Sequence, residues 1–227
     1  KVSVIIPAAG RSSRFGDKDK LAEDLGGRPL LMRTVEFFTK REEVTQIIVA
    51  APPDSYEDFK DRFGPPLSFH GVVIVKGGKA RWESVQNTLP TINTEIDRVV
   101  IHDAARPAIS NELFNSLMLA ARELEAVAAA LPISGTVKRT KQAKKTIGDD
   151  DDIADSVFGE AGRATVDAFP VEQTIDRTRL WELQTPQIFS LELLLRAYVD
   201  AKQVQPTDDA QLVEALGEVV HLVRGDS

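Results

Sequence analysis

The chain has 227 residues, of which 42% are apolar and 28% are charged, a composition typical of a soluble globular protein with a sizeable core. It contains no cysteine, which excludes disulfide bonds and thiolate metal sites, and its net charge of −7 argues against a general nucleic-acid binder. No apolar run approaches the ~20 residues that span a bilayer, and the N-terminus carries no signal-peptide pattern, so we expect a cytoplasmic protein without membrane or nucleic-acid partners.

Strand and helix patterns alternate along the first 133 residues. Short apolar runs predict buried strands, and the segments between them repeat apolar residues at intervals of three and four, as amphipathic helices do. The predicted strands are 2–7, 44–51, 72–75, 98–102 and 126–133. The predicted helices are 29–40, 54–63 (ending at Gly64-Pro65-Pro66), 81–89 and 110–125 (with Ser110 as N-cap). This alternation predicts a single α/β domain over 1–227, with a Rossmann-like, mostly parallel sheet flanked by helices.

The pattern breaks after the fifth strand. Residues 136–145 are basic, and residues 149–152 are four consecutive aspartates. A charge run of this kind favours a solvated loop, because it buries too little apolar surface to order itself. The alternative is a protruding hairpin with limbs at 136–140 and 171–177 and a mobile tip at about 141–169.

Regular structure resumes near Leu180. Residues 180–189 lead into a helix capped by Ser190. A further helix runs from about Thr207 to Gly217, and residues 219–223 predict a last strand.

Three polar or glycine-containing clusters directly follow predicted strands. They are residues 10–20, 77–78 and 103–106. In open α/β sheets ligands bind beyond the carboxyl ends of the strands, so we expect these clusters to meet at one edge of the sheet and form a ligand site.

The first cluster is a loop of small residues with four cations. It fails the P-loop pattern, because Gly10 and Gly16 are one residue too far apart and Asp17 follows, and it fails the dinucleotide G-x-G-x-x-G pattern. Its backbone N–H groups can still approach phosphate oxygens, and Arg14 and Lys20 could grip a triphosphate from two sides. The alternative is a solvated basic loop between strand and helix.

Asp103 lies just past a buried strand. Its carboxylate could hold a Mg²⁺ ion that bridges phosphates, and Arg106 could bind a phosphate or carboxylate through two parallel hydrogen bonds. Equally, the two side chains could form an ion pair that fixes the turn. His102 suits a packing role at the strand end better than that of a base, and no two histidines have the spacing of a zinc site.

Several motifs resemble those of the sugar-phosphate nucleotidylyltransferases. The segment Pro7-Ala-Ala-Gly-Arg-Ser-Ser-Arg-Phe-Gly, with Lys20-Leu21, is similar to their nucleotide-binding signature. Further motifs resemble one branch, the 2-C-methyl-D-erythritol 4-phosphate cytidylyltransferases of the non-mevalonate isoprenoid pathway. These are His102-Asp-Ala-Ala-Arg-Pro107, Thr174-Ile-Asp-Arg177 with Leu180-Trp181, and Gln184-Thr-Pro-Gln-Ile-Phe189. The motifs cover nearly the whole chain.

The resemblance implies a reaction of CTP with 2-C-methyl-D-erythritol 4-phosphate that gives 4-diphosphocytidyl-2-C-methyl-D-erythritol and pyrophosphate, with Mg²⁺. It implies catalytic roles for Arg14, Lys20 and Arg177. It implies that the nucleotide is bound by Ala8, Ala9, Gly10, Gly78, Arg81 and Ser84. It implies that the second substrate is bound by Asp103, Arg106, Thr136, Thr185 and Thr207, with Asp103 also at the metal.

The resemblance also implies that residues 136–177 form a β-arm that crosses to a second subunit, so that Arg177 completes the site of a homodimer. Three features depart from the family pattern. Pro-Lys-Gln at the catalytic lysine is Asp19-Lys20-Leu21 here, and the arm is longer than usual. The family continues past its last strand with a lysine-bearing segment that contacts the substrate, whereas the present sequence ends at Ser227.

Two other functions remain open from the sequence. The first is a cytidylyltransferase for another polyol phosphate, such as ribitol 5-phosphate. The second is a catalytically silent nucleotide-binding domain, for which the altered flanks of Lys20 and the missing tail are the only support.

Overall fold

The computed structural model describes residues 1–9, 19–148, 165–199 and 201–226. The chain divides into two compact units. Residues Lys1–Leu131 and Leu183–Ser227 form what we call the core unit, and Pro132–Glu182 form the arm unit. In the described part of the chain, no helix has the length and apolar character that crossing a membrane requires.

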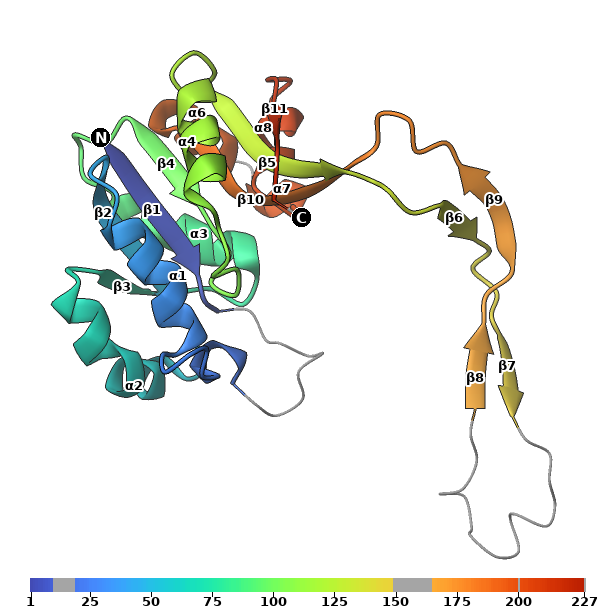
Figure 1. The fold of residues 1–227 in the computed structure, drawn as a ribbon, viewed down its shortest axis with the longest axis horizontal. Helices are drawn as coiled ribbons and strands as arrows, with labels where there is room; N and C mark the ends of the chain where they lie inside the picture. The colour runs from blue at the N-terminus through green and yellow to red at the C-terminus, as the bar shows by residue number, and fades with distance from the viewer. Residues whose placement is uncertain (10–18, 149–164, 200, 227) are drawn as a thin grey trace, which may run out of the picture. The chain divides into compact units, whose positions relative to one another are not determined.

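The core unit is built on a seven-stranded sheet (Figure 1). The strand order is β11-β5-β10-β4-β1-β2-β3. Their bounds are β1 Val2–Pro7, β2 Val44–Ala51, β3 Val73–Lys76, β4 Arg98–Ile101, β5 Ala126–Pro132, β10 Trp181–Ser190 and β11 His221–Arg224. β1 pairs in parallel with β2 and β4, β2 with β3, and β5 with β11, whereas β10 runs antiparallel to β4. The expected mostly parallel α/β sheet is therefore confirmed.

Helices cover both faces of this sheet. They are α1 Leu30–Thr39, α2 Tyr56–Phe69, α3 Arg81–Thr88, α4 Asn111–Ala120, α6 Leu191–Tyr198, α7 Ala201–Val204 and α8 Ala210–Ala215, with 3₁₀ turns η2 Lys20–Ala22 and η3 Leu89–Thr91. Successive residues of β1 point to opposite faces, so Val4 and Ile6 pack with α1, α2 and α4, while Ile5 packs with α3, α6 and α8. The first strand is therefore buried on both faces, and its apolar residues Val4, Ile5 and Ile6 are consecutive instead of alternating with polar ones.

Helix α2 is longer than the sequence predicts. We expect it to end at Gly64, but it continues through Pro65 and Pro66 to Phe69. The reason lies in its apolar stripe, because Phe59, Phe63 and Leu67 are spaced by four residues and all three are buried. Burying Leu67 offsets the backbone hydrogen bonds that the prolines cannot donate. Helix α4 is shorter than predicted and ends at Ala120, followed by turns.

The arm unit contains two antiparallel strand pairs. Strand β6 (Val137–Thr140) pairs with β9 (Val171–Ile175), and β7 (Lys145–Gly148) pairs with β8 (Thr165–Ala168). The described part of the arm unit thus takes the hairpin form, which composition alone made the less favoured alternative to a loop. Cross-strand pairs explain how so charged a segment orders itself, since Lys144 Nζ lies 2.6 Å from Asp167 and Thr146 donates to the same carboxylate at 2.7 Å.

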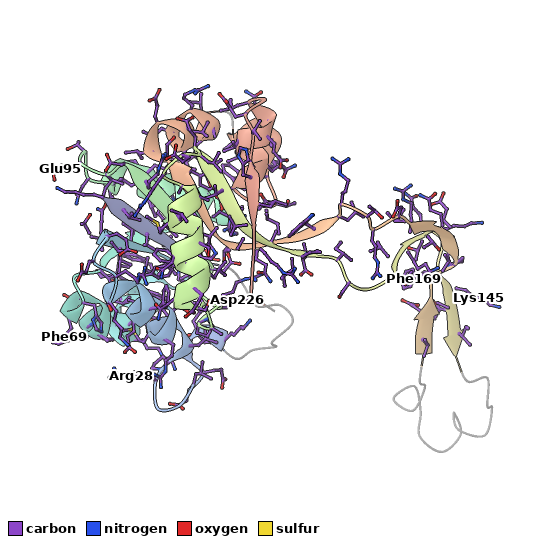
Figure 2. The ribbon with its side chains drawn as sticks, turned by 45° about the horizontal axis from the view of Figure 1, so that its top comes forward. Arg28, Phe69, Glu95, Lys145, Phe169 and Asp226 are labelled. Atoms are coloured by element: carbon purple, nitrogen blue, oxygen red, sulfur yellow. The ribbon has the colours of Figure 1, made fainter. Side chains whose placement is uncertain are left out.

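Apolar side chains of the arm unit are exposed. Ile147 and Val166 lie opposite each other in the ladder, and both are more than half exposed. Phe169, which lies between β8 and β9, and Val171, the first residue of β9, are exposed as well. Figure 2 shows Phe169 and Lys145 on this unit. A two-stranded ribbon that leaves such residues in water is marginally stable by itself, which makes this surface suited to a partner.

Candidate active site

The loops after β1 and β3 meet at the carboxyl-terminal edge of the sheet. The backbone N–H of Ala8 donates to Ala50 and that of Gly77 donates to Ala51, so β2 holds both loops. A Cβ atom built on Gly77 would lie 2.8 Å from the Ala51 oxygen and 3.1 Å from the Ala9 Cβ. Glycine is therefore required at 77 for the two loops to approach this closely. The sequence predicts that residues 10–20 meet the Gly77-Gly78 segment; Ala8 and Ala9, which lead into that loop, lie there, while residues 10–18 are outside the described residues.

The Gly77-Gly78 loop folds tightly onto the first turn of α3. Gly78 N–H donates to the buried Ser84 Oγ at 3.0 Å, and Glu83 Oε2 accepts from the N–H groups of Lys79 and Ala80 at 2.7 and 3.0 Å. A Cβ on Gly78 would fall 2.2 Å from the Glu83 Cβ, so no other residue fits there. This turn places Arg81, the first residue of α3, beside the end of β4.

Arg81 joins two carboxylates. Its Nε–H donates to Asp103 Oδ1 at 3.2 Å, and its Nη1–H donates to Asp209 Oδ2. Burial opposes the charge on the guanidinium, but Asp209 and Asp103 outweigh it and raise the pKa of Arg81 above its usual value. Asp103 in turn receives the Nε–H of Arg106 on Oδ2 at 3.2 Å. The ion pair that the sequence offered as the alternative role of Asp103 and Arg106 is therefore present, and Arg81 extends it.

Asp209 and Tyr198 belong to the same cluster, although no sequence pattern pointed to them. Asp209 is fully buried just before α8, and it accepts hydrogen bonds from Arg81 and from the Tyr198 hydroxyl of α6. Burial and the neighbouring carboxylate of Asp209 raise the pKa of Tyr198, so the hydroxyl keeps its proton and remains a donor. The only signal in the sequence was a pair of aspartates at a helix start, which reads equally well as two exposed caps.

The turn after β4 is held from three sides. His102 Nε2–H donates to the Arg106 carbonyl at 2.9 Å, Thr185 Oγ accepts from the Asp103 N–H at 3.1 Å, and Thr34 Oγ donates to the Ala104 carbonyl at 2.9 Å. Thr185 is buried on β10. In this structure it therefore orients the Asp103 turn. His102 is buried against Phe38 at 5.3 Å between ring centroids, which fits the packing role expected for it.

Acidification should lower the stability of the protein because of His102. Burial lowers the pKa of His102 from 6.5 to about 4. Between these two pH values the unfolded chain therefore binds a proton at His102, whereas the folded protein does not. The free energy of unfolding is therefore unaffected above about pH 7 and falls as the pH drops, by about 2 kcal/mol from pH 7 to pH 5.

Urea unfolding at pH 7 and pH 5 in metal-free buffer, for the wild type and for His102→Gln, measures this effect. The variant keeps an N–H donor but cannot titrate, so it should lose about 2 kcal/mol less over that interval. Equal losses in the two proteins would show that His102 does not carry the dependence.

Lys20 is the first residue of the turn η2. Asp19 caps this turn by accepting the Leu21 N–H at 3.1 Å, and its other oxygen lies 3.4 Å from the Arg62 guanidinium of α2. Leu21 packs against the core beneath. The two residues that depart from the family's Pro-Lys-Gln pattern thus fix the backbone at Lys20 on both sides.

The remaining predicted site residues belong to different parts of the chain. Gly10 and Arg14 lie outside the described residues. Thr207 is exposed and bonds to Gln211 in the first turn of α8. Thr136 and Arg177 belong to the arm unit, where they flank the same end of the β6–β9 ladder, since Val137 pairs with Ile175.

The residues at Asp103 fit one metal ligand rather than a complete metal site. Among the residues that the structure describes, no three histidine or carboxylate side chains gather to hold an ion. The Asp103 carboxylate is 34% exposed, and each oxygen keeps a lone pair beyond its arginine contact. Mg²⁺ commonly takes one protein carboxylate and completes its shell with substrate phosphates and water, and Asp103 fits that arrangement.

Comparison with known proteins shows the family to which the chain belongs. Residues 2–155 and 162–227 match the model of the 2-C-methyl-D-erythritol 4-phosphate cytidylyltransferase family. The chain belongs to this family. The cytidylyltransferase of Alkaliphilus oremlandii is 32% identical over 229 residues, which cover 99% of this chain and 86% of that one. The enzyme of Geobacillus kaustophilus is 33% identical over 225 residues, which cover 98% and 87%.

Solved structures of the family share its fold. The 2-C-methyl-D-erythritol 4-phosphate cytidylyltransferase of Thermus thermophilus is 30% identical, with a TM-score of 0.72 over 100% of this chain and 90% of that one. The 4-diphosphocytidyl-2C-methyl-D-erythritol synthase of Anaerococcus prevotii is 27% identical, with a TM-score of 0.75 over 99% and 89%. The family and the fold expected from the motifs are thus both confirmed.

Proposed function

We propose that this cytidylyltransferase transfers the CMP group of CTP to 2-C-methyl-D-erythritol 4-phosphate and releases pyrophosphate. The observation that supports this most is the cluster of Arg81, Asp103 and Arg106 beside the Gly77-Gly78 loop, in a chain of this family. The loop offers backbone close enough for a nucleotide, and the arginines offer charge for its phosphates. The reaction belongs in the cytoplasm, where CTP is available.

In the proposed reaction, an oxygen of the substrate's phosphate attacks the α-phosphorus of CTP in line. The new P–O bond forms as the bond to the pyrophosphate oxygen breaks, and pyrophosphate leaves with the electron pair. Such a step needs positioning and charge neutralisation more than proton transfer. Lys20 and Arg14 supply positive charge at the α-phosphate, while Ala8, Ala9, Gly10, Gly78, Arg81 and Ser84 hold the nucleotide.

The other residues would orient the acceptor. Arg106 and Arg177 would bind its phosphate, and the hydroxyl groups of Thr136, Thr185 and Thr207 would contact the acceptor. Asp103 would hold Mg²⁺ against the CTP phosphates. When bound, the ion neutralises charge on the triphosphate and on the leaving pyrophosphate.

The active form is proposed to be a homodimer through the arm unit. The exposed Ile147, Val166, Phe169 and Val171 are the support, because a second copy would remove these apolar side chains from water. In that assembly Arg177 of each chain would serve the other chain's site.

The function is tested by pyrophosphate release from CTP with three acceptors in parallel. We expect 2-C-methyl-D-erythritol 4-phosphate to be used with a kcat/KM at least about 100-fold above that of ribitol 5-phosphate or glycerol 3-phosphate, because a site built to bind particular hydroxyls rejects acceptors that leave them unpaired. Equal turnover of all three would favour a general polyol-phosphate enzyme. CTP binding without any pyrophosphate release would favour a silent nucleotide-binding domain.

A further inference from the structure

Asp209 has features that a helix cap does not need. Its side chain is fully buried, whereas the neighbouring Asp208 performs the capping by accepting the Gln211 N–H at 3.0 Å. A buried carboxylate costs free energy unless it is paired and hydrogen-bonded, and Asp209 meets both conditions through Arg81 and Tyr198. The α8 start is thus capped without it, and its contacts all point toward the β4 edge.

The position of Asp209 is set by the sheet and not by Arg81. The next residue, Ala210, donates its N–H to the buried Gln187 Oε1 at 3.1 Å. Gln187 lies on β10 directly opposite Ile101, the last residue of β4. The Asp209 backbone is therefore fixed beside β4, the strand that leads into Asp103, and the Tyr198 hydroxyl fixes one oxygen of its carboxylate.

Arg81, by contrast, has a long side chain whose orientation depends on its contacts. It lies between Asp209 and Asp103, and its Nε and Nη1 groups face different carboxylates. Because the guanidinium is planar and its N–H groups form a rigid fork, two acceptors on different elements define its plane. With only Asp103 left, Arg81 would be held by one carboxylate that it shares with Arg106, and the plane of its guanidinium would no longer be fixed, whereas Arg106 would keep its own contact with Asp103 Oδ2.

The balance of charges in this cluster also indicates that Asp209 helps to orient Arg81. Arg81 and Arg106 carry two positive charges, and Asp103 and Asp209 carry two negative charges. Asp209 pairs with Arg81 on the buried side of the cluster. Asp103, on the exposed side, is shared between Arg81 and Arg106. A carboxylate that did not have to balance two arginines alone would be better able to face a cation and phosphates.

We infer that Asp209 is a positioning residue for the nucleotide: it acts through Arg81, aiming the guanidinium at the CTP site and leaving Asp103 able to face a cation. This inference rests on the proposed function, because it takes the edge with Gly78 and Arg81 as the CTP site. Asp209 itself does not touch either substrate.

The test compares Asp209→Asn with Asp208→Asn. Both variants remove one negative charge from the same turn, but only the first breaks the contact with Arg81. We expect Asp209→Asn to raise the KM for CTP about tenfold and to weaken CTP binding in calorimetry by a similar factor, since small displacements of a positioning group cost this much or more. The KM for 2-C-methyl-D-erythritol 4-phosphate should change less than about twofold, and Asp208→Asn should behave as the wild type.

A merely structural role would give a different result. Loss of folded protein lowers the apparent kcat through the amount of active enzyme and leaves both KM values unchanged. A CTP KM for Asp209→Asn within about twofold of that for Asp208→Asn would overturn the inference.

Tyr198→Phe is the second variant, in case Asp209→Asn does not fold. It removes only the hydroxyl that orients Asp209, so we expect a smaller rise in the CTP KM, about threefold, with the KM for the acceptor unchanged. No rise would also overturn the inference. Failure of the proposed function would look different, because the wild type itself would then release no pyrophosphate.

Discussion

Replacing Lys20 with alanine should lower kcat by about 10²–10³-fold, the loss typical when one preorganised donor to transition-state charge is removed. Binding of CTP in calorimetry should weaken far less, because the negative charge that Lys20 meets grows as the acceptor oxygen attacks. The geometry makes this expectation sharper than the sequence did. Lys20 begins a capped turn, with Asp19 accepting the Leu21 N–H, so its backbone is held before substrates arrive.

Two further variants calibrate the Lys20 result. Lys40→Ala removes the same charge from the exposed residue that ends α1 and should keep wild-type kcat. Lys20→Arg keeps the charge but not the shape of the donor, so it should recover part of the loss. If Lys20→Ala changed only the KM for CTP, the lysine would be a ground-state contact and not a group that stabilises the transition state.

Shortening the arm unit should abolish dimerisation and most activity together. We would remove residues 142–169 and join the ends with Asn-Gly, a turn that suits a two-residue hairpin loop. The β6–β9 ladder stays intact, since Thr140 still pairs with Val171, whereas the exposed Ile147 and Val166 are lost. Sedimentation should then show a monomer, with pyrophosphate release reduced at least about tenfold, because Arg177 would no longer be held in a partner's site.

A milder variant separates apolar contact from the loss of chain. Ile147→Ser with Val166→Ser keeps the length of the arm unit and alters one opposed pair of its ladder. This double variant should weaken the dimer in sedimentation at low concentration. A fully active monomer from the 142–169 deletion would show that the arm unit is dispensable for the reaction.

Much of the core unit could be predicted because its information is local. Apolar runs and the three-four spacing of helices predict the strands and helices that lead to the site, and the carboxyl-edge rule predicts that the clusters 10–20, 77–78 and 103–106 lie at one edge of the sheet. The two glycines were predicted as part of the site, and the structure gives the reason: a side chain at either position would collide with its neighbours.

Contacts distant in sequence could not be predicted. Asp209 meets Arg81 across 128 residues, and nothing in a Thr-Asp-Asp-Ala segment indicates which aspartate turns inward. Asp103 shows the same limit, because its sequence supported both a metal ligand and an ion pair. The ion pair with Arg106 is local and was one of the two alternatives, whereas the contact with Arg81 is visible only once β4 and α3 are packed.

The charge run after β5 favoured a loop over a hairpin for a different reason. Average composition favoured a loop, whereas strand pairing depends on which residues lie opposite each other. Asp167 is placed to accept from both Lys144 and Thr146, so a segment poor in apolar residues still forms a ladder.

The two prolines of α2 have a consequence for how the chain folds. A peptide with Gly64-Pro65-Pro66 near its middle could not hold a helix by itself, because it lacks donors where the helix would need them. The helix exists because Phe59, Phe63 and Leu67 dock on the sheet, and α2 packs against the edge strand β3. Helix α2 is therefore held by its packing on β3 and the rest of the sheet and not by its own helix propensity. The Gly77-Gly78 loop follows β3 directly, so the nucleotide side of the proposed site depends on the same packing.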